Sequence, residues 1–162
     1  MSDGRRPNPR PNVESLEGRE LLSTIAKNVP TSILFTPIVE GTPLAEHIHP
    51  TLTIVIDGQN LPIPAGIGLG AKGNLPIHTH DSSGFLHIES TAKLPFRLRD
   101  FFTIWGQPFS KSNVLGHQAD KTHKVTMTID GRPSNAFGSL LLQDRQDIVI
   151  RYTTTGHSSK RK

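Results

Sequence analysis

The octapeptide Thr-Leu-Thr-Ile-Val-Ile-Asp-Gly, residues 51–58, gives the clearest indication of the fold. Leucine or isoleucine occupies every second position, which is typical of a β-strand with one face on a core, and the closing Asp-Gly predicts a tight turn. Residues 125–132, Val-Thr-Met-Thr-Ile-Asp-Gly-Arg, echo this pattern. We therefore expect two similar strand–turn units in one sheet, and residues 61–64 are expected to return as a strand after the first turn.

Residues 96–106 predict the one well-formed helix of the chain. Apolar and mostly aromatic side chains recur there at positions i, i+3, i+4 and i+7, and they are Leu98, Phe101, Phe102 and Trp105. Gly106 and the following Pro108 predict the end of the helix. Because aromatic stripes of this kind are commonly buried, the stripe predicts core packing rather than a ligand platform.

The segments around these elements carry weaker signals. Residues 31–46 contain two prolines and predict a short edge strand followed by a loop. The glycine-rich residues 65–70 lack the Gly-Lys-Ser/Thr ending of a phosphate loop and predict a flexible connection. Residues 140–142 and 148–152 flank a polar turn and predict a last hairpin.

The composition favours a small β-rich domain. Thirteen prolines, fourteen glycines and 34% hydrophobic residues among 162 suit many turns and short strands rather than a helix bundle. We predict an α+β fold, mainly antiparallel β, in which short hairpins pack on one aromatic helix in a β-grasp-like arrangement; the alternative is a small barrel or sandwich. The predicted domain covers residues 31–153, between a disordered tail at 1–30 and a basic disordered tail at 154–162.

The net charge of +4 does not indicate a nucleic-acid-binding protein. Basic and acidic residues balance over residues 1–20 and again over residues 21–150, so the excess comes from Arg151 and residues 160–162. A chain that is neutral except for a few basic residues near its C-terminus lacks the basic surface that specific nucleic-acid binding needs. No window approaches the roughly 20 apolar residues that a membrane span needs, so we expect no transmembrane segment.

Residues 76–90, Pro-Ile-His-Thr-His-Asp-Ser-Ser-Gly-Phe-Leu-His-Ile-Glu-Ser, hold three of the eight histidines. The Asp-Ser-Ser-Gly at residues 81–84 is a turn signal, and the flanks alternate as strands do. His78 and His80 therefore share one face of a strand. If the hairpin register places His78 opposite His87, all three rings converge on one spot.

Further candidate ligands accompany this hairpin. His47 and His49 form a second His-x-His and could complete or replace the first set if the upstream segment folds over it. Glu89 and Asp81 are candidates for a fourth ligand, for a group that orients an imidazole, or for a catalytic base. Asp81 is equally suited to starting its turn. The remaining three histidines, His117, His123 and His157, stand in polar, loop-like surroundings and are expected to be ordinary.

The absence of cysteine excludes disulfides, thiolate metal sites and thiol catalysis. Imidazole nitrogens suit Cu(II) and Zn(II), and they must be deprotonated to bind, so we expect binding to weaken between about pH 7 and pH 5. The glutamate of a cupin motif, the nucleophile elbow of a serine hydrolase and the barrel length of a His-x-His amidohydrolase are all missing.

Three hypotheses for the function follow from these residues. The first is a metal-binding domain holding Cu(II) or Zn(II). The second is a metalloenzyme with an open metal position for hydrolytic or oxygen chemistry, in which Glu89 or Asp81 would take part in catalysis. The third is a structural or adhesive β module whose histidines form a polar network.

Several blocks of the body resemble an uncharacterised family of bacterial and archaeal proteins. The blocks are HxHPxL from His47, IPAGIG from Ile63, HTHDxxGxxHxE from His78 and DFFxIWG from Asp100, and together they fall within residues 47–152. Members of that family often carry a cysteine shortly before the His-Thr-His-Asp block, whereas this chain has none. The family has no established activity, so the resemblance implies no function.

A second resemblance concerns the N-terminal region. Residues 16–23, Leu-Glu-Gly-Arg-Glu-Leu-Leu-Ser, are similar to the LEPRxLL motif near the N-terminus of many bacterial surface and exported proteins, with Gly18 where proline is commonest. This resemblance implies a destination in the cell envelope or outside the cell, with the cytoplasm as the alternative. It implies nothing about chemistry.

Overall fold

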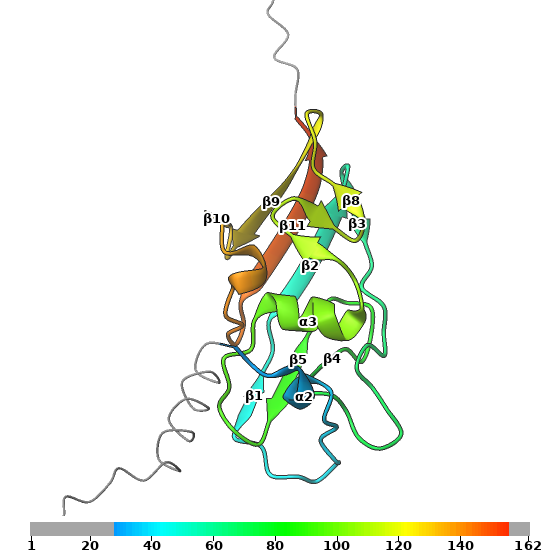
Figure 1. The fold of residues 1–162 in the computed structure, drawn as a ribbon, viewed down its shortest axis with the longest axis vertical. Coiled ribbons are helices and arrows are strands. Elements are labelled where there is room, and N and C mark those ends of the chain that lie inside the picture. Colours follow the sequence, from blue (N-terminus) through cyan, green and yellow to red (C-terminus); the bar gives the residue numbers. More distant parts are fainter. Residues whose placement is uncertain (1–27, 156–162) are drawn as a thin grey trace, which may run out of the picture.

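The computed structural model describes residues 28–155 (Figure 1). The predicted tails therefore lie largely outside the described residues, and so do the LEPRxLL-like segment and His157. At the two ends of the described part, Val29 belongs to the hydrophobic core and the amide of Thr155 donates a hydrogen bond to the carbonyl of Thr122.

A five-stranded sheet forms the larger part of the fold. Its strands, in the order in which they pair, are β10 (Arg132–Ser134), β9 (His123–Ile129), β11 (Asp147–Thr154), β2 (Thr51–Ile56) and β3 (Gln59–Leu61). The central strand β11 is parallel to β2 and antiparallel to β9, and each of these two pairs with its own hairpin partner. A central strand that lies between two hairpins and runs parallel to the first of them is the β-grasp-like arrangement predicted from the sequence.

The two echoing segments build equivalent hairpins on either side of β11. Asp57 and Gly58 have φ angles of 47° and 84°, and Asp130 and Gly131 have 51° and 76°. Two successive positive φ angles define the tight turn that matches the twist of paired strands, and Asp-Gly is a favoured sequence for it. Because this turn leaves no further loop residues, β3 begins at Gln59 rather than at the predicted residue 61.

The helix α3 (Leu98–Trp105) is the predicted aromatic helix, and it crosses in front of the large sheet in Figure 1. Leu98, Phe101 and Phe102 are at most 2% exposed and join the same core as the inner side chains of β2, β9 and β11. Gly106 ends the helix in the left-handed conformation with a φ of 71°. The predicted packing role of the stripe is confirmed.

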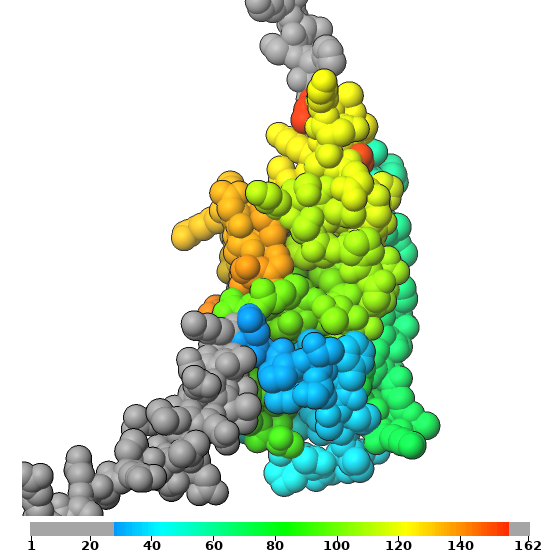
Figure 2. All heavy atoms as spheres, viewed as in Figure 1, coloured from blue at the N-terminus to red at the C-terminus, as the bar shows by residue number. Residues whose placement is uncertain are grey.

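A smaller sheet lies beyond α3, at the lower end of the molecule in Figure 1. It has the strand order β1 (Glu46–Ile48), β5 (His87–Ser90) and β4 (Ile77–His78). Figure 2 shows that the first described residues, coloured blue to cyan, cover the lower part of this face of the molecule. A third set of short strands, β6 (Phe109–Ser110), β7 (Asn113–Val114) and β8 (His117–Gln118), follows α3, and the 3-10 helix η1 (Phe137–Ser139) follows β10.

Two predictions about the elements are wrong. The predicted edge strand after residue 31 is instead one helical turn, α2 (Thr31–Leu34), because packing of the buried Leu34 into the core outweighs the local strand preference. The predicted last hairpin does not form either. Residues 140–142 run beside the start of α3, where Leu141 bridges to Arg97, and β11 instead enters the middle of the sheet. No sheet closes into a barrel within residues 28–155.

Candidate metal centre

The small sheet brings the two histidine-rich segments of the chain together. β5 lies between β4 and β1, and its register sets His87 opposite His78 and Glu89 opposite His47. The predicted cross-strand pairing of His78 with His87 is confirmed, and their stacked rings have centroids 5.3 Å apart. The upstream His-x-His does fold over the hairpin, as the ring of His49 lies 4.8 Å from that of His87.

Five imidazole rings form one continuous cluster, which we call the histidine cluster: His47, His49, His78, His80 and His87. Their side chains offer two groups of three ligand atoms, and within each group the atoms lie within 4.8 Å of one another. The inner group is His78, His80 and His87, and the outer group is His47, His49 and His87. Within residues 28–155, no other set of histidine and carboxylate side chains meets this condition.

His78 is fully buried, and only one of its two ring nitrogens has a partner. Nδ1 lies 2.9 Å from the carbonyl oxygen of Leu75, which can only accept, so Nδ1 carries the proton and donates. The other nitrogen, Nε2, is therefore unprotonated and carries a free lone pair, and it has no hydrogen-bond partner. Burial lowers the pKa of His78, which favours this neutral form. A fixed ring with a free nitrogen is the form in which histidine binds metals.

The glycine-rich loop holds the backbone of His78 in place. A Cβ at Gly68 would lie 2.6 Å from the carbonyl oxygen of Ile77 and 3.1 Å from Cβ of His78, so only glycine allows this approach. The neighbouring Thr79 is fully buried, and its hydroxyl donates to the carbonyl of Pro64 at 2.8 Å. The loop predicted as a flexible connection is thus packed against the strand that carries the site.

His87 is the residue that the two groups share. Burial, together with the nearby rings of His80, His78 and His49, lowers the pKa of His87 from 6.5 to about 4. Its ring is therefore neutral and able to bind metal well below pH 6. The expected weakening of metal binding between pH 7 and pH 5 moves to lower pH for this ligand, because the proton competes less well for it.

Glu89 lies between members of the two groups. Its Oε1 is 3.4 Å from Nε2 of His47 and 4.0 Å from Nε2 of His78. Both distances are longer than an ordinary hydrogen bond, so the carboxylate faces the cluster without being tied to either ring. This position is compatible with all three roles that the sequence left open for Glu89, namely a ligand, an orienting group or a base.

The second carboxylate candidate, Asp81, has a different place. Its Oδ1 accepts a hydrogen bond of 2.9 Å from the amide of Ser83, and hydrogen bonding to the side chain of Ser83 and to this amide lowers the pKa of the Asp81 carboxyl. Neither group of three ligand atoms includes it. The aspartate therefore forms the turn of the hairpin, and the turn closes at Gly84, where a side chain would collide with the carbonyl of Leu52.

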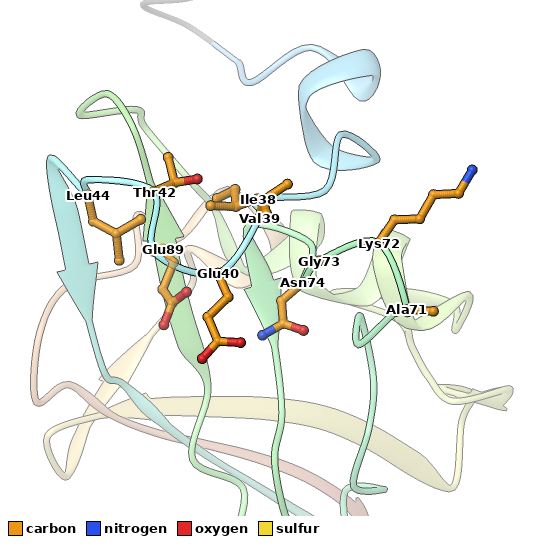
Figure 3. A pocket seen from close by; sticks show the side chains of 12 residues that line it. Ile38, Val39, Glu40, Thr42, Leu44, Ala71, Lys72, Gly73, Asn74 and Glu89 are labelled. Carbon is orange, nitrogen blue, oxygen red and sulfur yellow. The ribbon is translucent and has the colours of Figure 1, made fainter.

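A pocket of about 790 Å³ opens beside the cluster, and Glu89 lines it. Figure 3 shows the carboxylates of Glu89 and Glu40 on the same side as the amide of Asn74, whereas Lys72 extends away from them. Apolar side chains of Ile38, Val39 and Leu44 complete the wall. The pocket falls in the size range of small-molecule sites.

Sequence reasoning did not identify several residues of this region. The carbonyl of Leu75 fixes the tautomer of His78, and a backbone group gives no signal in a sequence. The exposed ring of Phe85 stacks on His49 at a centroid distance of 5.3 Å. Glu40 stands in a segment without periodicity. Gly68 stands in the glycine-rich run of residues 65–70, and such glycines can also mark a close approach of the backbone.

Three comparisons were made with known proteins. No protein-family model matches the chain, and no match was found among curated proteins or among solved structures. Within the described part of the chain, none of the helices has the length and apolarity that a membrane crossing requires.

Proposed function

We propose that the protein is a metal-binding domain in which His78, His80 and His87 hold one divalent transition-metal ion, Cu(II) or Zn(II). The observation that carries the proposal is Nε2 of His78, which is buried and has no hydrogen-bond partner, on a residue that belongs to the inner group. An unsatisfied buried polar atom costs about 1–3 kcal/mol, and a bound metal ion would remove this cost at His78.

The surroundings of the inner group support this reading. Three nitrogens are the usual protein contribution to an open zinc site, and imidazole suits Cu(II) equally well. The hydrogen bond to Leu75 and the contact with Gly68 fix the buried ring, so little ordering is needed on binding. A purely structural polar network is the weaker alternative, because such a network would satisfy Nε2 of His78 rather than leave it bare.

Titration calorimetry with Zn(II) and Cu(II) at pH 7.5, on the full chain without a His-tag, tests the proposal. We expect the wild type to bind, and the triple variant His78→Ala, His80→Ala, His87→Ala to lose at least about 100-fold in affinity. The double variant His117→Ala, His123→Ala serves as the control and should bind as the wild type does. If the wild type binds neither metal better than the triple variant, the structural module becomes the better account.

A metalloenzyme with an open metal position for hydrolytic or oxygen chemistry is the second candidate function. The position of Glu89 favours it, since this carboxylate lines the 790 Å³ pocket and also lies 4.0 Å from Nε2 of His78. Glu89 would then accept a proton from an attacking water, and an ion held by His78, His80 and His87 would supply Lewis-acid chemistry. Turnover of a model ester by the Zn(II)-loaded protein, lost on chelation and in Glu89→Gln while metal binding is kept, would support it.

We also propose a destination in the cell envelope or outside the cell, on the sole basis of the LEPRxLL-like residues 16–23. Fractionation of cells that express the full chain tests this proposal. Recovery in the cytoplasm alone, with the N-terminus intact, would contradict it.

A further inference from the structure

The five histidines do not converge on one point. Their ligand atoms separate into two groups of three that share His87, rather than forming one group of five. A metal ion at 2.0–2.1 Å from each nitrogen can serve one group, but it cannot reach the far members of the other. The geometry therefore offers two metal positions that share His87.

Two residues connect these positions. His87 belongs to both groups, and an imidazole has two ring nitrogens that can each hold one ion. Glu89 contacts one member of each group, with a single oxygen 3.4 Å from Nε2 of His47 and 4.0 Å from Nε2 of His78. A shared imidazole and a carboxylate placed between two sets of ligands suit a pair of neighbouring cations, because the carboxylate and a deprotonated imidazole carry negative charge that offsets the repulsion between the ions.

We propose that the histidine cluster is a two-metal centre in which a second divalent transition-metal ion binds to His47, His49 and His87. This inference rests on the proposed function of the inner group. His87 bridges the two ions through its two ring nitrogens; the second ion takes the place of the remaining ring proton, which passes to the solvent. The carboxylate of Glu89 lies between the ions.

The two positions differ in exposure, which sets their order of filling. Each group has one exposed member, His80 in the inner and His47 in the outer, but only the inner group has a fully buried member, His78, whose ring is fixed. An exposed ring must be ordered when it binds, and this ordering reduces the affinity. The inner position therefore fills first, and the outer position binds the second ion more weakly.

The stoichiometry of metal binding tests the two-metal centre. The full chain without a His-tag is titrated with Zn(II) by calorimetry at pH 7.5 and checked by elemental analysis. We expect two equivalents for the wild type, one for His47→Ala, His49→Ala, and two for the matched control His117→Ala, His123→Ala. Circular dichroism confirms that each variant is folded.

Electron paramagnetic resonance with Cu(II) tests the bridge. At one equivalent the spectrum should be that of an isolated ion, and at two equivalents the ions should couple and the isolated signal should diminish. His47→Ala, His49→Ala should give only the isolated signal.

Each other outcome is decisive. If the wild type binds one equivalent of metal, and the variant His47→Ala, His49→Ala also binds one, the two-metal centre is overturned and the proposed function stays intact. Two equivalents in that variant, or two uncoupled Cu(II) ions in the wild type, also overturn it. No binding by the wild type overturns both proposals together.

Discussion

Histidines lie at both ends of the molecule, and the two groups differ in the partners of their ring nitrogens. At the upper end in Figure 1, β9 begins with His123, whose ring stacks on Tyr152 at 4.8 Å and 3°. Its Nδ1 is 2.7 Å from the hydroxyl of Thr122, and carboxylates of Asp57 and Asp120 lie within 3.9 Å of the ring nitrogens. Every nitrogen of this histidine faces a polar partner.

The histidine cluster at the other end has the opposite character. The rings there face one another, and Nε2 of the buried His78 has no hydrogen-bond partner, while the carboxylate of Glu89 lies 4.0 Å away. The difference teaches that proximity of imidazoles is not what marks a metal site. In a structural histidine, both ring nitrogens form polar contacts with neighbouring groups. In a metal ligand, one ring nitrogen forms a hydrogen bond that fixes the ring, and the lone pair of the other nitrogen stays available for the metal.

The largest expected effect comes from removing the free nitrogen while keeping the fixed one. In His78→Asn, the side-chain amide can still donate to the carbonyl of Leu75, but Nε2 is gone. We expect metal affinity to fall at least about 100-fold, with the free energy of unfolding of the metal-free protein changed by about 1 kcal/mol or less. Calorimetry with Zn(II) and urea unfolding in the presence of a chelator measure the two quantities.

The matched variant at the upper end is His123→Asn. It should leave metal affinity unchanged and should destabilise the protein slightly, because the stack on Tyr152 is lost. Equal losses of metal affinity in His78→Asn and His123→Asn would show that the histidines at the two ends do not differ as metal ligands.

A smaller effect is expected from the loop behind the site. Gly68 and Gly131 have φ angles of 73° and 76°, but a Cβ would collide with Ile77 and His78 at Gly68 and would meet nothing within 4 Å at Gly131. Both Gly→Ala variants share a backbone strain of about 1–2 kcal/mol. Gly68→Ala should lose roughly 1–3 kcal/mol more, since the strand must shift.

Metal affinity separates these two variants further. The shift in Gly68→Ala moves the backbone that carries His78, so its Zn(II) affinity should fall, whereas Gly131→Ala should bind as the wild type does. Urea unfolding of the metal-free proteins and calorimetry provide the values. Equal destabilisation of the two variants would show that the close approach of the loop is unimportant.

The smallest effect concerns acid. The pKa of His87 is about 4 in the folded protein and 6.5 as an ordinary value, so between these pH values the unfolded chain binds more protons than the folded one. The free energy of unfolding of the metal-free protein therefore falls as the pH is lowered from about 6.5 to 4. The contribution of this group is on the order of 1 kcal/mol once its solvent exposure is taken into account.

Urea midpoints at pH 7 and pH 5, in the presence of a chelator, measure this dependence. His87→Leu should show a smaller loss of stability on acidification than the wild type, and His117→Ala should show the same loss as the wild type. An equal loss in His87→Leu would mean that the cluster does not contribute to the acid sensitivity.

Local patterns in the sequence determined much of the fold. The alternation over residues 51–58 and 125–132 and the Asp-Gly pairs predict β2, β9 and their turns because strand period and turn chemistry act over a few residues. The helical spacing of Leu98, Phe101 and Phe102 predicts the buried face of α3 for the same reason. The pairing of His78 with His87 also follows locally, from a four-residue turn between alternating flanks.

Only the tertiary structure decided the contacts between distant segments. The parallel pairing of β11 with β2 joins residues about a hundred positions apart, and no local signal specifies such a partner. The turn at Thr31–Leu34 became helical because Leu34 packs into a core assembled from the rest of the chain.

The candidate site shows the same division. The sequence supplied the five imidazoles and Glu89, whose spacing is a local property. Their separation into two groups around His87, the carbonyl of Leu75 that fixes His78 and the glycine loop behind it depend on how three segments pack together. The free lone pair on His78 is a consequence of burial, and burial is decided by the whole fold.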